Sequence, residues 1–168
     1  RPTAIEALGK IGSEEAVNFM IAKYPEEDEL TKFSIIESFG QIGNPQAFFM
    51  MLSEMANLKD QLTWAAVYSL RMLKDKLGLD VPFDEHMKNA ILRTLIEGEI
   101  KYKRAAADLI TAFDDKDIVA ACMRILGSDD EINENIKSKL LDNPQIFYPL
   151  AAELLKEKPA NSNLILNI

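Results

Sequence analysis

Hydrophobic residues near the start of the chain lie three or four positions apart. In two successive segments the apolar positions are Ile5, Leu8 and Ile11, then Val17, Met20 and Ile21. Residues at these intervals share one face of an α-helix, whereas a half-buried strand alternates apolar and polar positions. No part of the chain shows such alternation between turn residues, so the sequence predicts an all-α fold.

The apolar pattern repeats with a period of 31 residues. A shift by this period superimposes one set of residues on another: Ile5, Leu8, Gly9, Ile11, Gly12 and Ala16 fall on Ile36, Phe39, Gly40, Ile42, Gly43 and Ala47. Two further copies, around Leu70 and Ile110, keep the apolar positions without the glycines, and a weaker fifth begins at Asp142. A period between about 20 and 50 residues is typical of stacked helical repeats.

Each copy contains a helix stop followed at once by a helix start. Gly12, Gly43 and, in the fourth copy, Asp114 stand where a left-handed residue would end a helix. The next helix then begins at an N-cap side chain and, twice, a proline: Ser13, Asn44 with Pro45, and Asn143 with Pro144. The earlier glycines, Gly9 and Gly40, are predicted to allow close approach of helices. The alternative, a phosphate-binding glycine loop, needs a preceding strand, which the pattern does not provide.

These signals divide the chain into helices and a tail. The predicted helices span residues 2–11, 14–24, 29–42, 45–57, 60–77, 83–97, 101–113, 116–126, 131–141 and 144–157. An interruption at Leu77–Pro82 supplies the extra length between the third and fourth copies. Residues 159–168 have no helix caps and are expected to be extended or frayed. Because the chain starts inside a helical pattern without methionine, we expect a single repeat domain, 1–168, from a longer chain.

Composition and charge narrow the possible functions. Of 168 residues, 48% are hydrophobic and 27% charged, as in a globular protein. No apolar run approaches the ~18 residues of a membrane span, so no membrane insertion is expected. The net charge of −8 opposes binding to nucleic acid or anionic membranes, since such binding depends on Lys and Arg. The single cysteine, Cys122, excludes an intrachain disulfide and fits a reducing, cytoplasmic location.

The first fifty residues resemble HEAT-like repeats of the phycobilisome-lyase type. That pattern runs Arg, spaced alanines, Ala-Leu-Gly-x-Ile-Gly, a short polar stretch and Ala-Val, and the matching residues are Arg1, Ala4, Ala7, Leu8, Gly9, Ile11, Gly12, Ala16 and Val17. The second copy has Lys32 in the Arg place and Phe39 in the Leu place. The resemblance implies a right-handed α-α superhelix, an α-solenoid of about five HEAT-like helical hairpins with a concave surface for a partner.

Candidate chemical groups are few. HEAT-like iron hydroxylases carry repeated His-Glu pairs as metal ligands. This chain has one histidine, His86, and it follows Glu85 rather than preceding a glutamate. A built metal site needs three or four ligands. The acidic runs Glu26–Glu29, Asp114–Asp117 and Asp129–Glu131 lack the ligand spacing of a calcium loop and suit helix N-termini. Cys122 lies among apolar residues, as a core residue does. The sequence therefore predicts no catalytic residue, cofactor or metal.

A set of residues on neighbouring predicted helices is suited to contact a protein partner: Phe33, Glu37, Trp64, Tyr68, Arg71 and Arg104. Trp64, Tyr68 and Arg71 are spaced i, i+4 and i+7, so they share a flank of one helix. The repeat register places Phe33 and Arg104 level with Trp64, and it places Glu37 level with Tyr68. Trp, Tyr and Arg predominate in binding hot spots. In the alternative, Trp64 and Phe33 pack between repeats.

Three functions stay open at this point. The leading interpretation is a scaffold for protein–protein interaction without catalytic activity. A second, implied by the resemblance to bilin lyases, is an accessory subunit or lyase-like protein that holds a substrate protein and its chromophore. A third, which the acidic charge disfavours, is a HEAT-like protein that processes nucleic acid.

Overall fold

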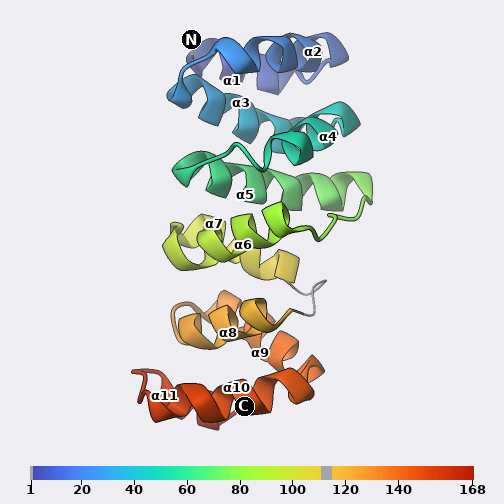
Figure 1. Cartoon of the computed structure of the whole chain (residues 1–168). Helices are drawn as coiled ribbons and strands as arrows, with labels where there is room; N and C mark the ends of the chain where they lie inside the picture. The colour runs from blue at the N-terminus through green and yellow to red at the C-terminus, as the bar shows by residue number, and fades with distance from the viewer. Residues whose placement is uncertain (1, 111–114) are drawn as a thin grey trace. The chain divides into compact units, whose positions relative to one another are not determined.

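The computed structural model describes residues 2–110 and 115–168, and within these ranges every regular element is a helix (Figure 1). The elements are α1 (Pro2–Ile11), α2 (Glu14–Lys23), η1 (Tyr24–Glu26), α3 (Glu29–Ile42), α4 (Pro45–Glu54), α5 (Asp60–Leu77), α6 (Glu85–Glu97), α7 (Ile100–Leu109), α8 (Lys116–Ile125), α9 (Asp130–Asp142), α10 (Pro144–Lys156) and α11 (Ser162–Leu166). The predicted all-α class is confirmed. The chain forms two compact units, Arg1–Ala90 and Ile91–Ile168, whose boundary falls within α6.

Helices of the N-terminal unit alternate between two layers. In one layer α3 lies between α1 and α5 and packs against both, and the three helices follow one another in Figure 1. In the other layer α2 packs against α1 and α4, while α4 also packs against α3 and α5. Each of the helices α1 to α4 therefore contacts its hairpin partner and the equivalent helix of a neighbouring copy, which gives the 31-residue period a structural basis.

Glycine and serine bring the helices of the first layer close together. A Cβ atom added at Gly9 would lie 2.8 Å from Ser38 Oγ, and one added at Gly40 would lie 2.8 Å from Ser69 Oγ. Such distances are shorter than a carbon–oxygen contact allows, so α1, α3 and α5 meet at positions that only glycine fits. The Ser69 hydroxyl also donates a hydrogen bond to the Ile36 carbonyl oxygen at 2.8 Å. The predicted role of Gly9 and Gly40 is confirmed.

The predicted hinges are present in the first two copies. Gly12 and Gly43 have φ values of 64° and 75°, in the left-handed region where glycine is favoured. Ser13 Oγ accepts a hydrogen bond from the Ala16 N–H at 3.1 Å, and Asn44 Oδ1 accepts one from the Gln46 N–H at 2.7 Å. Both side chains are therefore N-caps, as predicted.

The prediction that Asn143 caps α10 is wrong. Its φ and ψ of −128° and 54° lie outside the extended conformation that an N-cap residue usually adopts, and its side chain accepts no capping hydrogen bond. Instead Asn143 Nδ2 donates to the Lys139 carbonyl oxygen at 3.0 Å, so the amide closes the end of α9. The fourth-copy hinge residue, Asp114, lies outside the described residues.

Most predicted core positions are buried. Val17 and Met20 in α2 and Leu70 in α5 are completely inaccessible. Ile11 is different, because 68% of it is exposed although it continues the helical apolar spacing of Ile5 and Leu8. It is the last residue of α1, immediately before the left-handed Gly12, where the chain turns away from the packed helix.

In the C-terminal unit, helices also pack against both adjacent and more distant helices of the chain, and a short helix ends the chain. Here α9 packs against α7 and α8, and α10 packs against α8 and α9. The tail was expected to be extended or frayed, but it contains the short helix α11, in which Ile165 is buried. Asn161 Nδ2 ties the tail to the end of α8 by donating to the carbonyl oxygens of Met123 and Leu126, at 2.9 and 2.7 Å.

Candidate functional site

Helix α3 presents one open face. Its N-cap is Asp28, whose carboxylate accepts a hydrogen bond from the Thr31 N–H at 2.8 Å, and its core side is formed by Ile35 and Phe39, both fully buried. The opposite side carries residues spaced i, i+4, i+7 and i+11 that are exposed or half-buried: Leu30, Ser34, Glu37 and Gln41. Phe33 flanks this row and is half-buried.

The neighbouring helix α5 has the division that the sequence predicts. Val67, Leu70 and Leu73 are completely buried. Trp64, Tyr68 and Arg71 are each half-buried, so they line the flank of the helix rather than its core. Arg71 Nε lies 3.6 Å from Asp75 Oδ2, with 40% and 58% of these side chains exposed. Because α3 and α5 pack against each other, five of the six predicted binding residues lie on adjacent helices.

We call Phe33, Glu37, Trp64, Tyr68 and Arg71 the α3–α5 face. Two shallow grooves border it. One, with a volume of about 330 Å³, is lined by Glu29, Leu30, Phe33, Gln61 and Leu62 of α3 and α5. The other, of about 240 Å³, is more polar and is lined by Glu6, Lys10, Ser34, Glu37, Ser38 and Gln41 of α1 and α3. The face therefore offers an apolar and a polar recess on the two sides of α3.

The grooves also include three residues that were not predicted from the sequence: Leu30, Leu62 and Gln41. The helical spacing of the open α3 row was a signal for Leu30 and Gln41, because they lie four residues before Ser34 and four residues after Glu37. No local pattern identifies Leu62, which joins Leu30 only because α5 packs against α3.

Arg104 has a structural role in the C-terminal unit. Its guanidinium donates two hydrogen bonds to the Asp129 carboxylate, at 2.8 and 3.2 Å, and lies 3.4 Å from Glu131. The hydrogen bond to Asp129 raises the pKa of Arg104 further, and the same bond lowers the pKa of the Asp129 carboxyl. Asp129 also caps α9, accepting a hydrogen bond from the Ile132 N–H at 3.2 Å. Arg104 thus joins α7 to the start of α9, and we do not include it in the α3–α5 face.

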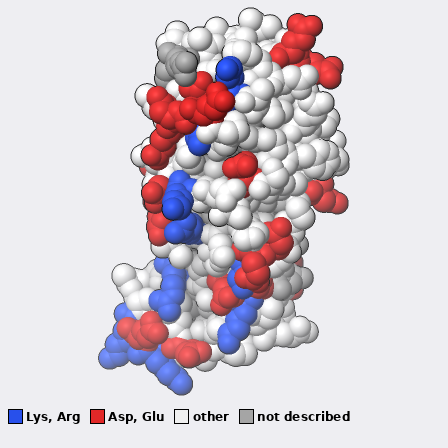
Figure 2. All heavy atoms as spheres, turned by 45° about the horizontal axis from the view of Figure 1, so that its top comes forward, with Lys and Arg blue, Asp and Glu red and all other residues white. Residues whose placement is uncertain are grey.

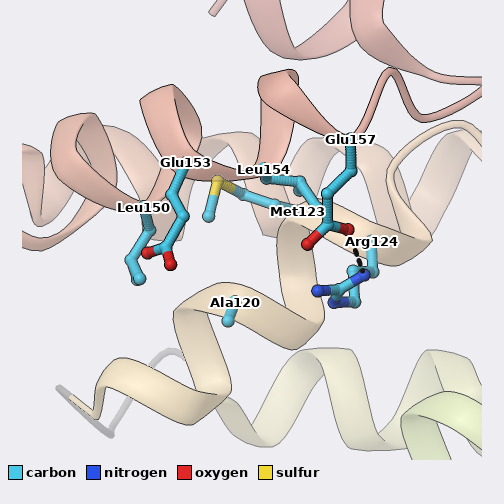
Figure 3. Close-up of a pocket in the computed structure, with 7 residues that line it drawn as sticks. All are labelled: Ala120, Met123, Arg124, Leu150, Glu153, Leu154 and Glu157. Carbon is cyan, nitrogen blue, oxygen red and sulfur yellow. Dashed lines mark ion pairs between the residues drawn. The ribbon is translucent and has the colours of Figure 1, made fainter.

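A third groove lies between α8 and α10 (Figure 3). Its volume is about 180 Å³, and its lining residues are Ala120, Met123, Arg124, Leu150, Glu153, Leu154 and Glu157. The Arg124 side chain reaches toward Glu157, with 3.6 Å between Nη1 and Oε2 (Figure 3). More than half of each of these two side chains is exposed, so their ion pair contributes little to stability.

The other candidates from the sequence have ordinary structural positions. Cys122 is buried, and this burial raises the pKa of its thiol to about 12, which disfavours the nucleophilic thiolate. His86 is exposed on α6. Among the described residues, no group of three or more His, Cys, Asp or Glu is arranged to hold a metal ion. Within the same ranges, no helix combines the length and the apolar character needed to cross a bilayer.

Comparison of the chain with protein-family models, with curated proteins and with solved structures finds no match.

Proposed function

We propose that this chain is a HEAT-like α-solenoid segment that serves as a scaffold for protein–protein interaction. The 31-residue period, the alternation of helix layers and the glycine contacts between α1, α3 and α5 support a superhelical array. In such an array the layer that contains α1, α3 and α5 forms the inner, concave side. The α3–α5 face then lies on the side that repeat proteins use to hold a partner.

The observation that carries this proposal is the position of three aromatic residues on open helix flanks. Phe33, Trp64 and Tyr68 are half-buried although their helices have complete apolar cores without them. Aromatic rings and arginine bury a large area at a low cost in side-chain entropy, so they supply much of the energy of binding interfaces. The adjacent groove of about 330 Å³ has room for an apolar side chain of a partner between Leu30 and Leu62.

A site-specific photocrosslinker tests the proposal in cells. A photoreactive phenylalanine analogue at Tyr68 should give adducts of discrete mass, whose protein component mass spectrometry identifies. The same analogue at Tyr148, which is 65% exposed on α10, is the matched control. Adducts at position 68 alone support a partner on the α3–α5 face. Equal adducts at both positions, or none at position 68, contradict it.

The binding energy of the identified partner provides the second test. Replacing Tyr68 and Arg71 together by alanine should weaken binding of the purified partner by about tenfold or more, as for hot-spot residues. Thermal unfolding of the same variant should stay close to that of the wild type, because neither residue belongs to the buried core. A large fall in melting temperature would assign both residues a structural role instead.

A further inference from the structure

The side of α1 that faces away from α3 carries an apolar stripe. Its residues, Ala4, Ala7 and Ile11, are spaced i, i+3 and i+7, so they share one face of the helix. Gly9, which meets Ser38 of α3, lies on the opposite face. All three stripe residues are exposed, and Ile11 is 68% exposed. In a folded protein the apolar stripe of a helix normally packs against another element.

The equivalent positions in the next two copies are buried. The 31-residue period takes Ala4 and Ala7 to one buried pair in α3 and to another in α5: Ile35 with Ser38, and Ala66 with Ser69. The helix that covers each pair comes from the preceding hairpin, because α1 packs against α3 and α3 packs against α5. Ala4 and Ala7 therefore lie on the side of α1 where a preceding hairpin would pack.

The contact that covers these positions is specific. Gly9 of α1 meets Ser38 of α3, and the next contact of this kind is made by Gly40 of α3. Each of these glycines follows a small residue by two positions, since Ala7 precedes Gly9 as Ser38 precedes Gly40. Alanine is smaller than serine, so α1 leaves room for a glycine to approach Ala7 equally closely. Helix α1 thus carries both halves of the contact, with the glycine side occupied by α3 and the Ala7 side open.

Two larger residues at this end of the unit follow the same trend. Ile11 corresponds to Ile42 and Leu73, which are half-buried and completely buried. Phe19 of α2 is 50% exposed, whereas the corresponding Met50 of α4 is half-buried. Figure 2 turns this end of the unit toward the viewer and shows mostly uncharged atoms there, with acidic groups toward the margins. We call the exposed apolar residues the α1–α2 end face: Ala4, Ala7, Ile11 and Phe19.

We infer that the α1–α2 end face is the docking surface of a further helical hairpin of the same repeat, joined to the chain ahead of α1, with a glycine against Ala7. In the described copies the covering hairpin is the one immediately before in the chain, as α1 and α2 are for α3, and residues 24–28 form the link. Four apolar residues are far fewer than the roughly 20–30 a side of a standard interface between separate proteins. A hairpin in the same chain does not need so large an area, because the link gives it a high effective concentration.

The position of the glycine in this hairpin follows from the period. A glycine 31 residues before Gly9 would meet Ala7 as Gly9 meets Ser38, and apolar residues should stand 31 positions before Ile5 and Leu8. Peptide mapping by mass spectrometry, on the protein isolated from its own cells, should find this pattern. Another residue at the glycine position, or a protein without the hairpin, would overturn the inference.

An added repeat tests whether the α1–α2 end face accepts a hairpin. A second copy of residues 1–31 placed directly before Arg1 keeps the period, because Thr31 of the added copy then precedes Arg1 as it otherwise precedes Lys32. Gly9 of the added copy should cover Ala7, so hydrogen exchange of the α1 amides should slow by about tenfold or more. Equal exchange rates with and without the added copy would overturn the inference.

The variant Ala7→Leu is the matched control for the glycine contact. Ala7 is exposed on a helix, so the original chain should tolerate leucine with unchanged circular dichroism and α1 exchange. In the extended chain the same substitution should remove the slower exchange, because the larger side chain keeps the glycine away. Slow exchange that persists in this variant would contradict the glycine contact. Replacement of Tyr68 and Arg71 by alanine should leave these rates unchanged, so failure of the scaffold function is distinguishable from failure of this inference.

Discussion

Neighbouring helices of the same layer meet differently in the two units. Between α3 and α5 the contact is a glycine against a serine, and the polar links end on backbone carbonyls: Ser69 donates to Ile36, and Lys76 Nζ donates to Gly40 and Gln41 at 3.0 and 2.6 Å. Between α7 and α9 the links join side chains, Arg104 with Asp129 and Asn135 with Asp108. The first kind of contact fixes how closely the backbones approach, whereas the second tolerates small adjustments.

The largest expected effect follows from the glycine contact. Gly40→Ala would place a Cβ 2.8 Å from Ser69 Oγ and 3.0 Å from Ser69 Cα, and a backbone atom cannot move aside cheaply. We expect it to lower the free energy of unfolding by about 1–3 kcal/mol, as overpacking does. Chemical denaturation measures this change. In a helix without the contact, a Gly→Ala substitution would raise the free energy of unfolding by about 0.5–1 kcal/mol. A stabilised Gly40→Ala variant would therefore contradict the close contact with Ser69.

Alkaline pH gives the next largest effect, in the C-terminal unit. The pKa of the buried Cys122 thiol is about 12 in the folded chain, against 9.0 for an accessible thiol. Above pH 9 the unfolded chain therefore releases this proton first, and stability falls as pH rises toward 12. The loss due to Cys122 should be about 1 kcal/mol at pH 10. Urea unfolding from pH 8 to 10.5 should show a shallower decline in Cys122→Ala, and an identical decline would contradict the assignment.

The Arg104–Asp129 contact should have a smaller effect with a defined pH dependence. The pKa of the Asp129 carboxyl is lower in the folded chain than in the unfolded chain. The ionised carboxylate therefore stabilises the fold at pH values above the unfolded-state pKa, and this stabilisation is lost as the pH falls through the folded-state pKa. Asp129→Ala removes both the ion pair and the α9 cap, whereas Asp129→Asn keeps a capping side chain. Melting temperatures at pH 7 should therefore rank wild type, then Asn, then Ala. Equal values for the two variants would mean that Asp129 acts through Arg104 alone.

The smallest expected effect is at Arg71. Its ion pair with Asp75 is 3.6 Å long and largely exposed, so Arg71→Ala should change the free energy of unfolding by less than about 0.5 kcal/mol. Chemical denaturation should give the same small difference in free energy of unfolding between the wild type and Arg71→Ala at two salt concentrations. A clear loss of stability would show that Arg71 supports the fold, and the argument that it serves a partner would then fail.

Most of the helices could be predicted because the residue that ends one helix lies next to the residue that begins the following one. Gly43 closes α3 and Asn44 opens α4 with bonds that reach no more than four residues along the chain. The same reasoning failed at Asn143, whose side chain bonds backward to Lys139 rather than forward into α10, and in the tail, where the partners are distant in sequence. Asn161, for example, donates to carbonyls 35 and 38 residues earlier, and no local pattern indicates such a partner.

The candidate site was predicted in part for a related reason. Helical spacing was enough to place Trp64, Tyr68 and Arg71 on one flank of α5, which depends on α5 alone. The role of Arg104 depends on where α9 begins, and the groove at Leu62 depends on how α3 packs against α5. These are properties of contacts between helices, which a single sequence does not contain.

The contact between Gly40 and Ser69 tests the central claim most directly, because the α3–α5 face exists only if α3 and α5 pack in this register. Nuclear Overhauser spectroscopy on labelled protein measures it without any substitution. The structure predicts strong cross-peaks between the Gly40 Hα and Ser69 Hβ protons, and equivalent ones between Gly9 and Ser38. If both sets are absent while the helices themselves are intact, the helices do not stack with the 31-residue period, and the account is wrong.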